Sequence, residues 1–396
     1  MAILARMSAI RSRGVDKHWT GLACWLVLAT CCLSARLAQG ADELQLGIPP
    51  LPDLPSLSLW QTVVTWEASA GYKDNVALSG VRPSGSPLVR NLAELLVWRL
   101  PGEGWEFQTF LTGEDVRYLS STVVDKEQTT LGVVQVNRVW SDEWTTGLTG
   151  QYLYQNRVLD LTTSLATPTV LLVQGHTYTG RGSVRRKFGQ GWTWGVEPAI
   201  TRQDFGGPLD DYWETGFKFS LGRESGRKSE TSLNYELTHR NHDRREQATV
   251  TGVAIPGSEL HLLQHRVQLQ WKCSWDELRH WRTSAKLAHE LSQDNGSGYF
   301  DSRRWQAGVE GRFANAVWDL RLTSRIAHTV FPHQPAIFGQ PQPAERTDFG
   351  INLRAERVLT KSLRWFAEWD FERSLANRPA TGYGVNLTQS GLILEF

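Results

Sequence analysis

From about residue 59 to the last residue, apolar and polar side chains alternate along the chain. In residues 61–72, one set of alternating positions consists of Thr62, Val64, Trp66, Ala68, Ala70 and Tyr72. The positions between them are mostly polar or small. Because successive side chains of a β-strand point to opposite faces, this pattern predicts strands with one apolar face and one polar face.

Sixteen segments with this pattern follow one another. Their predicted bounds are 59–74, 89–100, 105–118, 128–140, 144–155, 174–188, 192–204, 211–222, 229–240, 259–272, 281–291, 299–313, 317–329, 347–357, 362–373 and 381–396. Short connections at 101–104, 141–143, 189–191 and 314–316 alternate with mostly longer ones, such as 75–88, 156–173, 241–258 and 330–346. Short turns at one end and longer loops at the other are typical of membrane-spanning barrels. The sequence therefore predicts the all-β class, a transmembrane antiparallel β-barrel of about 16 strands, or 14 if one hairpin is lost.

Tryptophan supports a barrel in a membrane, because 18 Trp are many for a chain of this length. Several stand next to the short connections: Trp105, Trp144, Trp192, Trp281 and Trp318 each begin a predicted strand, and Trp98, Trp140 and Trp271 each end one. Trp at one level of a closed sheet forms an interfacial girdle, whereas a soluble core would have large residues along whole strands.

The first 40 residues have the three regions of a secretory signal. Basic residues precede an apolar run at 21–33, and small residues follow at 38–41, so we expect cleavage after Gly40. A membrane anchor is the alternative, but about 20 apolar residues are needed to span a bilayer. A lipoprotein signal at Cys31 is a second alternative. Residues 41–58 are rich in proline and predict a periplasmic lead-in, and residues 59–396 predict the barrel.

The overall charge is close to balanced, with 42 Lys and Arg against 41 Asp and Glu. This balance argues against nucleic acid as a partner. Three of the four cysteines lie in the predicted signal and only Cys273 follows it. An intrachain disulfide or a cysteine-bound metal is therefore excluded after cleavage, and the sequence predicts no metal and no cofactor.

Charged residues on the predicted inner face are unevenly distributed. A basic set lies on predicted strands ten to thirteen, with Glu290, Glu310 and Asp319 among it: Arg266, Lys272, Arg282, Lys286, Arg304, Arg312, Arg321 and Arg325. An acidic set lies on strands fourteen to sixteen and one to three, with Arg354 and Arg364 among it: Glu67, Glu94, Glu106, Glu114, Glu356, Glu368, Asp370 and Glu372. Opposed walls of this kind would line a pore and create a field across it. Alternatively, these groups pair with neighbours and only hydrate the interior.

The third long connection, 156–173, has two possible arrangements. It occupies the position that folds inward as a constriction in general porins, but it is apolar rather than acidic. We therefore favour the second arrangement, in which its two strands extend beyond the membrane.

Enzymatic and metal sites are weakly supported. Asp210 with Asp211 and His242 with Asp243 lie in neighbouring long connections, where carboxylates and a histidine could activate water. Loops are rich in these residues in any barrel, so we expect no enzyme. The pairs His239 with His242 and His261 with His265 lack a third convergent metal ligand.

The last residues carry a resemblance to a known family. The chain ends Leu392, Ile393, Leu394, Glu395, Phe396, which resembles the terminal strand of Gram-negative outer-membrane β-barrel proteins. The segment 68–78 resembles the first strand and loop of porin-type barrels. The resemblance implies that Phe396 belongs to the signal read by the barrel-assembly machinery and that the protein lies in the outer membrane, in contact with its lipid.

From these features the sequence predicts a porin-like channel for passive diffusion of small hydrophilic solutes. The alternatives are a dedicated export channel for a polysaccharide and a plugged surface adhesin or assembly scaffold. The sequence does not identify the solute or the oligomeric state.

Overall fold

The computed structural model describes residues 60–102, 104–162, 170–207, 209–226, 228–337, 341–378 and 381–396. In this part of the chain all sixteen predicted segments form strands. Their bounds are β1 Trp60–Lys73, β2 Ser86–Gly102, β3 Trp105–Tyr118, β4 Lys126–Val139, β5 Trp144–Asp160, β6 Val170–Phe188, β7 Trp192–Phe205, β8 Tyr212–Ser225, β9 Ser229–His242, β10 His261–Ser274, β11 Trp281–Asp294, β12 Ser302–Ala314, β13 Trp318–Pro335, β14 Pro343–Val358, β15 Leu363–Ala376 and β16 Tyr383–Glu395.

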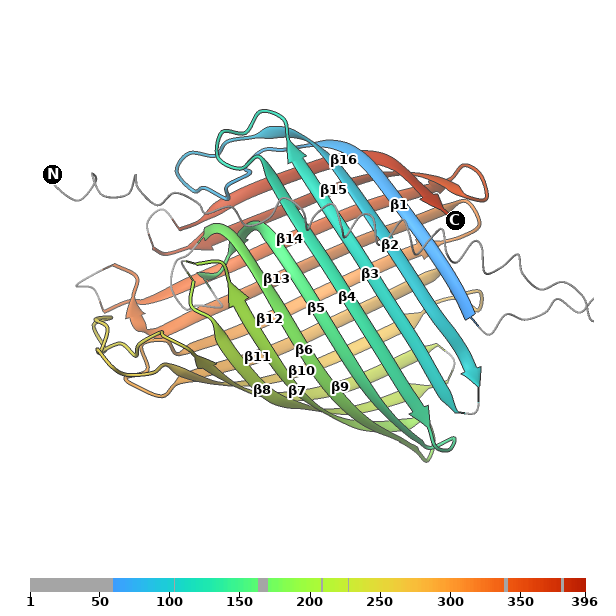
Figure 1. Cartoon of the computed structure of the whole chain (residues 1–396), viewed down its shortest axis with the longest axis horizontal. Coiled ribbons are helices and arrows are strands. Elements are labelled where there is room, and N and C mark those ends of the chain that lie inside the picture. Colours follow the sequence, from blue (N-terminus) through green and yellow to red (C-terminus); the bar gives the residue numbers. More distant parts are fainter. Residues whose placement is uncertain are drawn as a thin grey trace, which may run out of the picture. The chain divides into compact units, whose positions relative to one another are not determined.

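The strands form one closed antiparallel barrel (Figure 1). Each strand pairs with its neighbours in sequence, and β1 pairs with β16 through a register that runs from Thr65 opposite Glu395 to Lys73 opposite Leu387. Closure leaves no unpaired sheet edge, which a bilayer would not tolerate because it offers no water to exposed backbone groups. The predicted fold class and the number of 16 strands are thus confirmed.

The two faces of the sheet differ in polarity. On β1, Glu67 and Ser69 are buried on the inner face, whereas Trp66 and Tyr72 are exposed on the outer face. Large apolar side chains are exposed on the outer face of many other strands, among them Leu148, Ile200, Phe217, Leu269 and Leu322. A polar inside and an apolar outside are the inverse of a soluble barrel and suit a membrane-spanning one. Among the described residues, no helix has the length and apolarity that crossing a membrane requires.

The ends of the strands agree with the predicted bounds to within a few residues at the short turns. At the opposite end four strands extend at least four residues further than predicted, namely β5, β6, β13 and β14. The register explains the added length, because Asp160 pairs with Val170 at the end of the β5–β6 hairpin and Phe331 pairs with Ala344 on β13 and β14.

The aromatic girdle lies on the outer face near the short turns. Four of its Trp residues each lie beneath an arginine of the adjacent strand: Arg138 over Trp105 at 5.0 Å, Arg186 over Trp144 at 5.1 Å, Arg223 over Trp192 at 5.2 Å and Arg357 over Trp318 at 5.5 Å. Such pairs suit an interface, where the ring faces lipid and the guanidinium reaches water. The prediction was wrong for Trp98, which pairs with Gln61 and Gln108 and shares their inner face.

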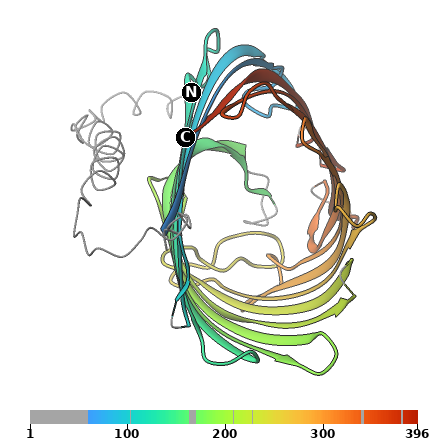
Figure 2. The same cartoon turned by 90° about the vertical axis from the view of Figure 1, so that its right-hand side faces the viewer.

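The β5–β6 hairpin folds into the barrel, contrary to our expectation that its strands extend beyond the membrane. Figure 2 shows the ends of both strands, in green, bending away from the wall. Their base packs in an apolar cluster with the loop after β1 and the ends of β2 and β3; its members are Val76, Leu88, Val116, Tyr118, Val124 and Val158. The main-chain N–H of Val158 also donates to the buried Glu127 carboxylate at 3.0 Å. The apolar residues of this connection therefore serve to fix an inward segment.

A second segment, the connection 243–260 between β9 and β10, also packs inside the barrel (Figure 2). Its residues Ala248 and Leu260 are buried against Leu262 and Phe331, which face inward from β10 and β13, and against Phe300 of the next loop. The Ser297 hydroxyl fixes the two loops together by donating to the Ala248 carbonyl at 2.7 Å. Two separate segments thus narrow the half of the interior that lies away from the short turns. The predicted signal and lead-in, residues 1–58, lie outside the described residues.

Candidate functional site

The interior of the barrel, called the lumen below, is the candidate site. All eight residues of the predicted basic set occupy the inner face by register. Four of them form ion pairs: Arg312 with Asp319, Arg321 with Glu310 at 3.8 Å, Arg325 with Glu372 at 3.3 Å and Lys272 with Glu230 at 3.1 Å.

The remaining four are Arg266, Lys286, Arg304 and Arg282, and none of them lies within ion-pair distance of a carboxylate among the described residues. Arg266 instead donates to Gln306 Oε1 at 3.3 Å. Three of these cations, all but Arg282, line one cavity. The positive charge of this wall is therefore concentrated on the middle of β10 to β12.

The predicted acidic set also occupies the inner face, and half of its members pair with arginines of the same wall. Glu67, which is only 4 % exposed, contacts Arg90 and pairs with Arg354 at 2.7 Å. Arg354 in turn pairs with Glu356 at 2.8 Å and with Glu368 at 3.0 Å.

The same network continues to both sides. Arg90 pairs with Glu114 at 2.5 Å, and Arg364 pairs with Glu356 at 2.9 Å. The other predicted acidic residues, Glu94, Glu106, Asp370 and Glu372, take no part in this network, although Glu106 accepts from Asn137 and Glu372 accepts from Tyr383. The charges predicted from the sequence for the acidic wall did not include Arg90, so the acidic wall is less negative than predicted.

The end of β5 on the inward hairpin, at Asp160 and called the hairpin tip below, meets the opposite wall of the barrel. Asp160 at the end of β5 pairs with Arg346 of β14 at 2.5 Å, and the same guanidinium donates through Nε to Asp348 at 2.6 Å. The side chains of Asp160 and Arg346 are 8 % and 6 % exposed. Seven strand steps separate β5 from β14 around the barrel in the shorter direction. This ion pair therefore crosses the lumen and defines its constriction.

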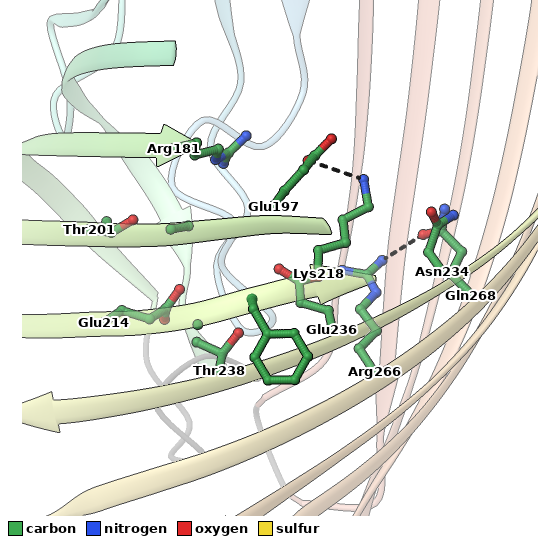
Figure 3. Close-up of a pocket in the computed structure, with 13 residues that line it drawn as sticks. Arg181, Glu197, Thr201, Glu214, Lys218, Asn234, Glu236, Thr238, Arg266 and Gln268 are labelled. Atoms are coloured by element: carbon green, nitrogen blue, oxygen red, sulfur yellow. Dashed lines mark hydrogen bonds and ion pairs between the residues drawn. The ribbon is translucent and has the colours of Figure 1, made fainter. Parts of the chain in front are cut away.

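A cavity of about 370 Å³ lies at this constriction. Its charged lining consists of Arg266, Lys286, Arg304, Arg325 and Arg346 against Asp160, Asp348 and Glu372. A neighbouring cavity of about 280 Å³ is lined by β6 to β10 and shares Arg266 (Figure 3). There the opposed charges are more evenly matched, because Lys218 faces Glu197 at 3.8 Å and Glu214 and Glu236 are close by.

Sequence reasoning missed Asp160 and Arg346 as residues of the constriction. Asp160 was assigned to a loop, and Arg346 stood one residue outside the predicted strand 347–357. The alternating pattern continues beyond the predicted start of the strand 347–357, and following it further would have placed Arg346 in that strand. Nothing in the pattern reveals that the β5–β6 hairpin bends inward, because bending depends on contacts between distant strands.

The candidate catalytic residues of the loops have structural roles. Asp210 accepts hydrogen bonds from the main-chain N–H groups of Arg244 and Arg245, at 3.0 and 2.8 Å. The His242 side chain is fully buried, 3.6 Å from Asp210.

The two remaining candidates are also engaged. Asp211 accepts from the main chain of Phe205, and Asp243 accepts two hydrogen bonds from Arg202, at 2.9 and 2.8 Å, which lower the pKa of its carboxyl. An imidazole without access to water is unsuited to activating it.

The histidine pairs do not form a metal centre in the described part of the chain. His239 and His261 lie on the outer face with ring centroids 5.7 Å apart, whereas His242 faces inward. His265 bonds to the Tyr235 hydroxyl. No group of three or more suitable ligands is present among the described residues.

Comparisons with known proteins give only distant similarities. No protein-family model matches the chain, and no curated protein matches it. Among solved structures, an anion-selective porin from Comamonas acidovorans is 12 % identical with a TM-score of 0.45, covering 85 % of this chain and 99 % of that one. OccAB1 of Acinetobacter baumannii is 10 % identical with a TM-score of 0.46, covering 85 % and 96 %.

A third similar structure is a bacterial polysaccharide outer membrane secretin, which is 10 % identical with a TM-score of 0.43 and covers 85 % and 97 %. At these levels the similarities say nothing about what this chain binds or carries. The chain's own strands define its class, a closed sixteen-stranded antiparallel β-barrel with a polar interior.

Proposed function

We propose that this protein is a channel of a Gram-negative outer membrane through which small hydrophilic solutes diffuse passively. The observation that best supports this proposal is the closed barrel of sixteen strands with charged and polar side chains along its inner face. Barrels of this size enclose a space wide enough for water. Polar walls keep that space hydrated, and the apolar outer face is in contact with membrane lipid.

The constriction gives the channel a preference for anions. Five cationic side chains line the cavity at the constriction, against three carboxylates. Two of these cations, Arg266 and Arg304, have no ion-pair partner among the described residues. The field at the narrowest point therefore comes mainly from the basic side chains. Charged side chains at a narrow point select ions by sign.

The proposal includes the route to the membrane. Residues 1–40 direct export, residues 41–58 form a periplasmic lead-in, and the last strand with Phe396 is recognised by the barrel-assembly machinery. The channel works without a catalytic step or a cofactor.

Swelling of liposomes that contain the refolded mature chain tests the channel. Uncharged sugars of increasing size should enter with rates that fall steeply with size, because a constricted pore excludes the larger ones. Replacing Arg304, Arg321 and Arg325 together with glutamate should shift the reversal potential in a salt gradient towards cation preference. Lys361→Glu, in a short turn, is the matched control and should leave the potential unchanged. An unchanged potential in the triple variant would contradict charge selection by this wall.

A second candidate function, a plugged adhesin or assembly scaffold, is favoured by one observation. The β5–β6 hairpin and the connection 243–260 both occupy the extracellular half of the lumen. A folded barrel that takes up no sugar would support this candidate, or a polysaccharide export channel that opens only with its partner.

A further inference from the structure

Three adjacent strands place an unusual row of side chains beside the constriction. Arg304 on β12 pairs directly with Thr329 on β13, and Thr329 pairs directly with Arg346 on β14. Directly paired residues on neighbouring strands have their side chains on the same face, about 5 Å apart at the Cβ atoms. All three side chains therefore point into the lumen side by side.

Each member of this row has a buried polar atom without a hydrogen-bond partner: Arg304 Nε, Thr329 Oγ1 and Arg346 Nη1. Arg266 on β10, two strands from Arg304, likewise has a buried Nε without a hydrogen-bond partner. Thr329 is 1 % exposed and Arg346 is 5 % exposed. Buried donors normally have partners, so several unsatisfied ones in one place favour the binding of a ligand with acceptor oxygens.

The surrounding charges favour an anion as that ligand. Five cationic side chains line the adjoining cavity of about 370 Å³, against three carboxylates. Two of those carboxylates, Asp160 and Asp348, are bonded to Arg346 and hold its guanidinium so that Nη1 stays unused. The third, Glu372, pairs with Arg325. Glu290 lies opposite Arg304 on β11 but is not within ion-pair distance of it.

We infer that Arg304, Thr329 and Arg346, with Arg266 beside them, form a binding site for a phosphate group, either free or esterified to a small solute. A tetrahedral oxyanion presents several acceptor oxygens in different directions, so it can accept hydrogen bonds from donors on three neighbouring strands at once. Guanidinium groups are well suited to phosphate because they donate parallel hydrogen bonds to its oxygens. The threonine hydroxyl adds a short neutral donor between them.

This inference rests on the proposed channel function for the route by which the anion reaches the cavity, but binding can be measured separately. Equilibrium dialysis of radiolabelled inorganic phosphate against the folded full-length barrel in detergent requires no conduction. In a planar bilayer, phosphate added to a chloride solution should reduce the chloride current and reach saturation. If the bilayer is silent while dialysis shows binding, the channel proposal fails and the site stands.

Three variants distinguish a specific phosphate-binding site from general attraction of phosphate to the positive charge of the lumen. Thr329→Val keeps the shape of the side chain and should weaken phosphate binding about 2- to 10-fold. Arg304→Gln should weaken it about 10- to 100-fold. Arg282→Gln, the matched control, removes an inward charge near the short turns and should change binding less than about 2-fold. Equal losses in Arg282→Gln and Arg304→Gln, or no saturable binding by the unchanged protein, would overturn the inference.

Competing ligands identify the source of the phosphate group. Glycerol 3-phosphate that displaces labelled phosphate at lower concentration than phosphate itself would support an esterified solute, and the reverse order would support the free ion. Acetate at the same concentration should compete poorly, because a planar carboxylate engages fewer of the donors. Acetate that competes as well as phosphate would contradict a tetrahedral site.

Discussion

The ion pair that crosses the lumen allows a direct test of the constriction. Asp160→Asn removes the negative charge at the hairpin tip while preserving its size. The two side chains of the pair are 8 % and 6 % exposed, so the surrounding solvent screens their attraction little. Breaking a buried pair costs about 3 to 5 kcal/mol. Because Arg346 keeps Asp348 as a second partner, we take the lower value, about 3 kcal/mol.

A loss of this size shifts the equilibrium between docked and undocked tips about 100-fold, since about 1.4 kcal/mol corresponds to a factor of ten. The base of the hairpin should stay in place, because the contacts of Val158 with Glu127 and with the apolar cluster are untouched. We therefore expect a wider and less steady lumen in a barrel that remains folded.

Single-channel recording is the assay. Asp160→Asn should show a larger mean conductance and more frequent transitions between current levels than the unchanged protein. Asp243→Asn is the matched control, because it breaks the pair with Arg202, 2.8 Å long, at the outer rim rather than in the lumen. If Asp160→Asn has the same conductance and the same noise as the unchanged protein, the hairpin tip does not limit the current and this reasoning is refuted.

Three further predictions concern the wall, the chain end and one turn. Glu67→Gln should lower the free energy of unfolding by about 3 to 5 kcal/mol, because Glu67 is 4 % exposed and contacts two arginines; a urea midpoint that hardly moves would contradict this. Phe396→Ala should change the stability of the refolded barrel by less than about 0.5 kcal/mol, since Phe396 is 74 % exposed, yet reduce the amount assembled in the outer membrane of cells; normal assembly would argue against its role as a signal. The main-chain N–H of Trp281 donates a hydrogen bond to the Asp276 carboxylate and lowers the pKa of this carboxyl in the folded protein. The hydrogen bond therefore stabilises the fold above about pH 4, the pKa in the unfolded chain, and this stabilisation is lost as the pH falls through the folded-state pKa. Asp276→Asn should therefore be less stable than the unchanged protein at pH 7 in denaturant titrations, and the difference should shrink as the pH falls through the folded pKa of Asp276. A difference that is constant with pH would be contrary evidence.

The alternation of side chains was sufficient to predict the sheet, because a strand between lipid and water must repeat every two residues. The alternation within a single strand therefore shows which of its residues face inward. Arg304 and Glu368 could be assigned to the inner face without any knowledge of the neighbouring strands. Trp98 shows the limit of a rule based on strand ends: its position near a turn suggested lipid, while its parity puts it in the lumen.

The constriction could not be predicted in the same way. It depends on Asp160 reaching Arg346 across seven strand steps, and such a contact leaves no local periodic signal. The apolar residues of 156–173 were interpreted as strands that continue outward, whereas Val158 and Val173 are buried inside the barrel. Polar and apolar composition predicts how much of a segment is buried but does not specify which side of the wall it is buried on.

Conductance of the refolded mature chain in a planar bilayer, recorded with a salt gradient across it, tests the channel most directly. A water-filled lumen predicts steady openings of nanosiemens order, with a reversal potential that indicates preference for anions. A verified folded barrel that stays silent would contradict the channel and favour a plugged scaffold or an exporter that needs a partner.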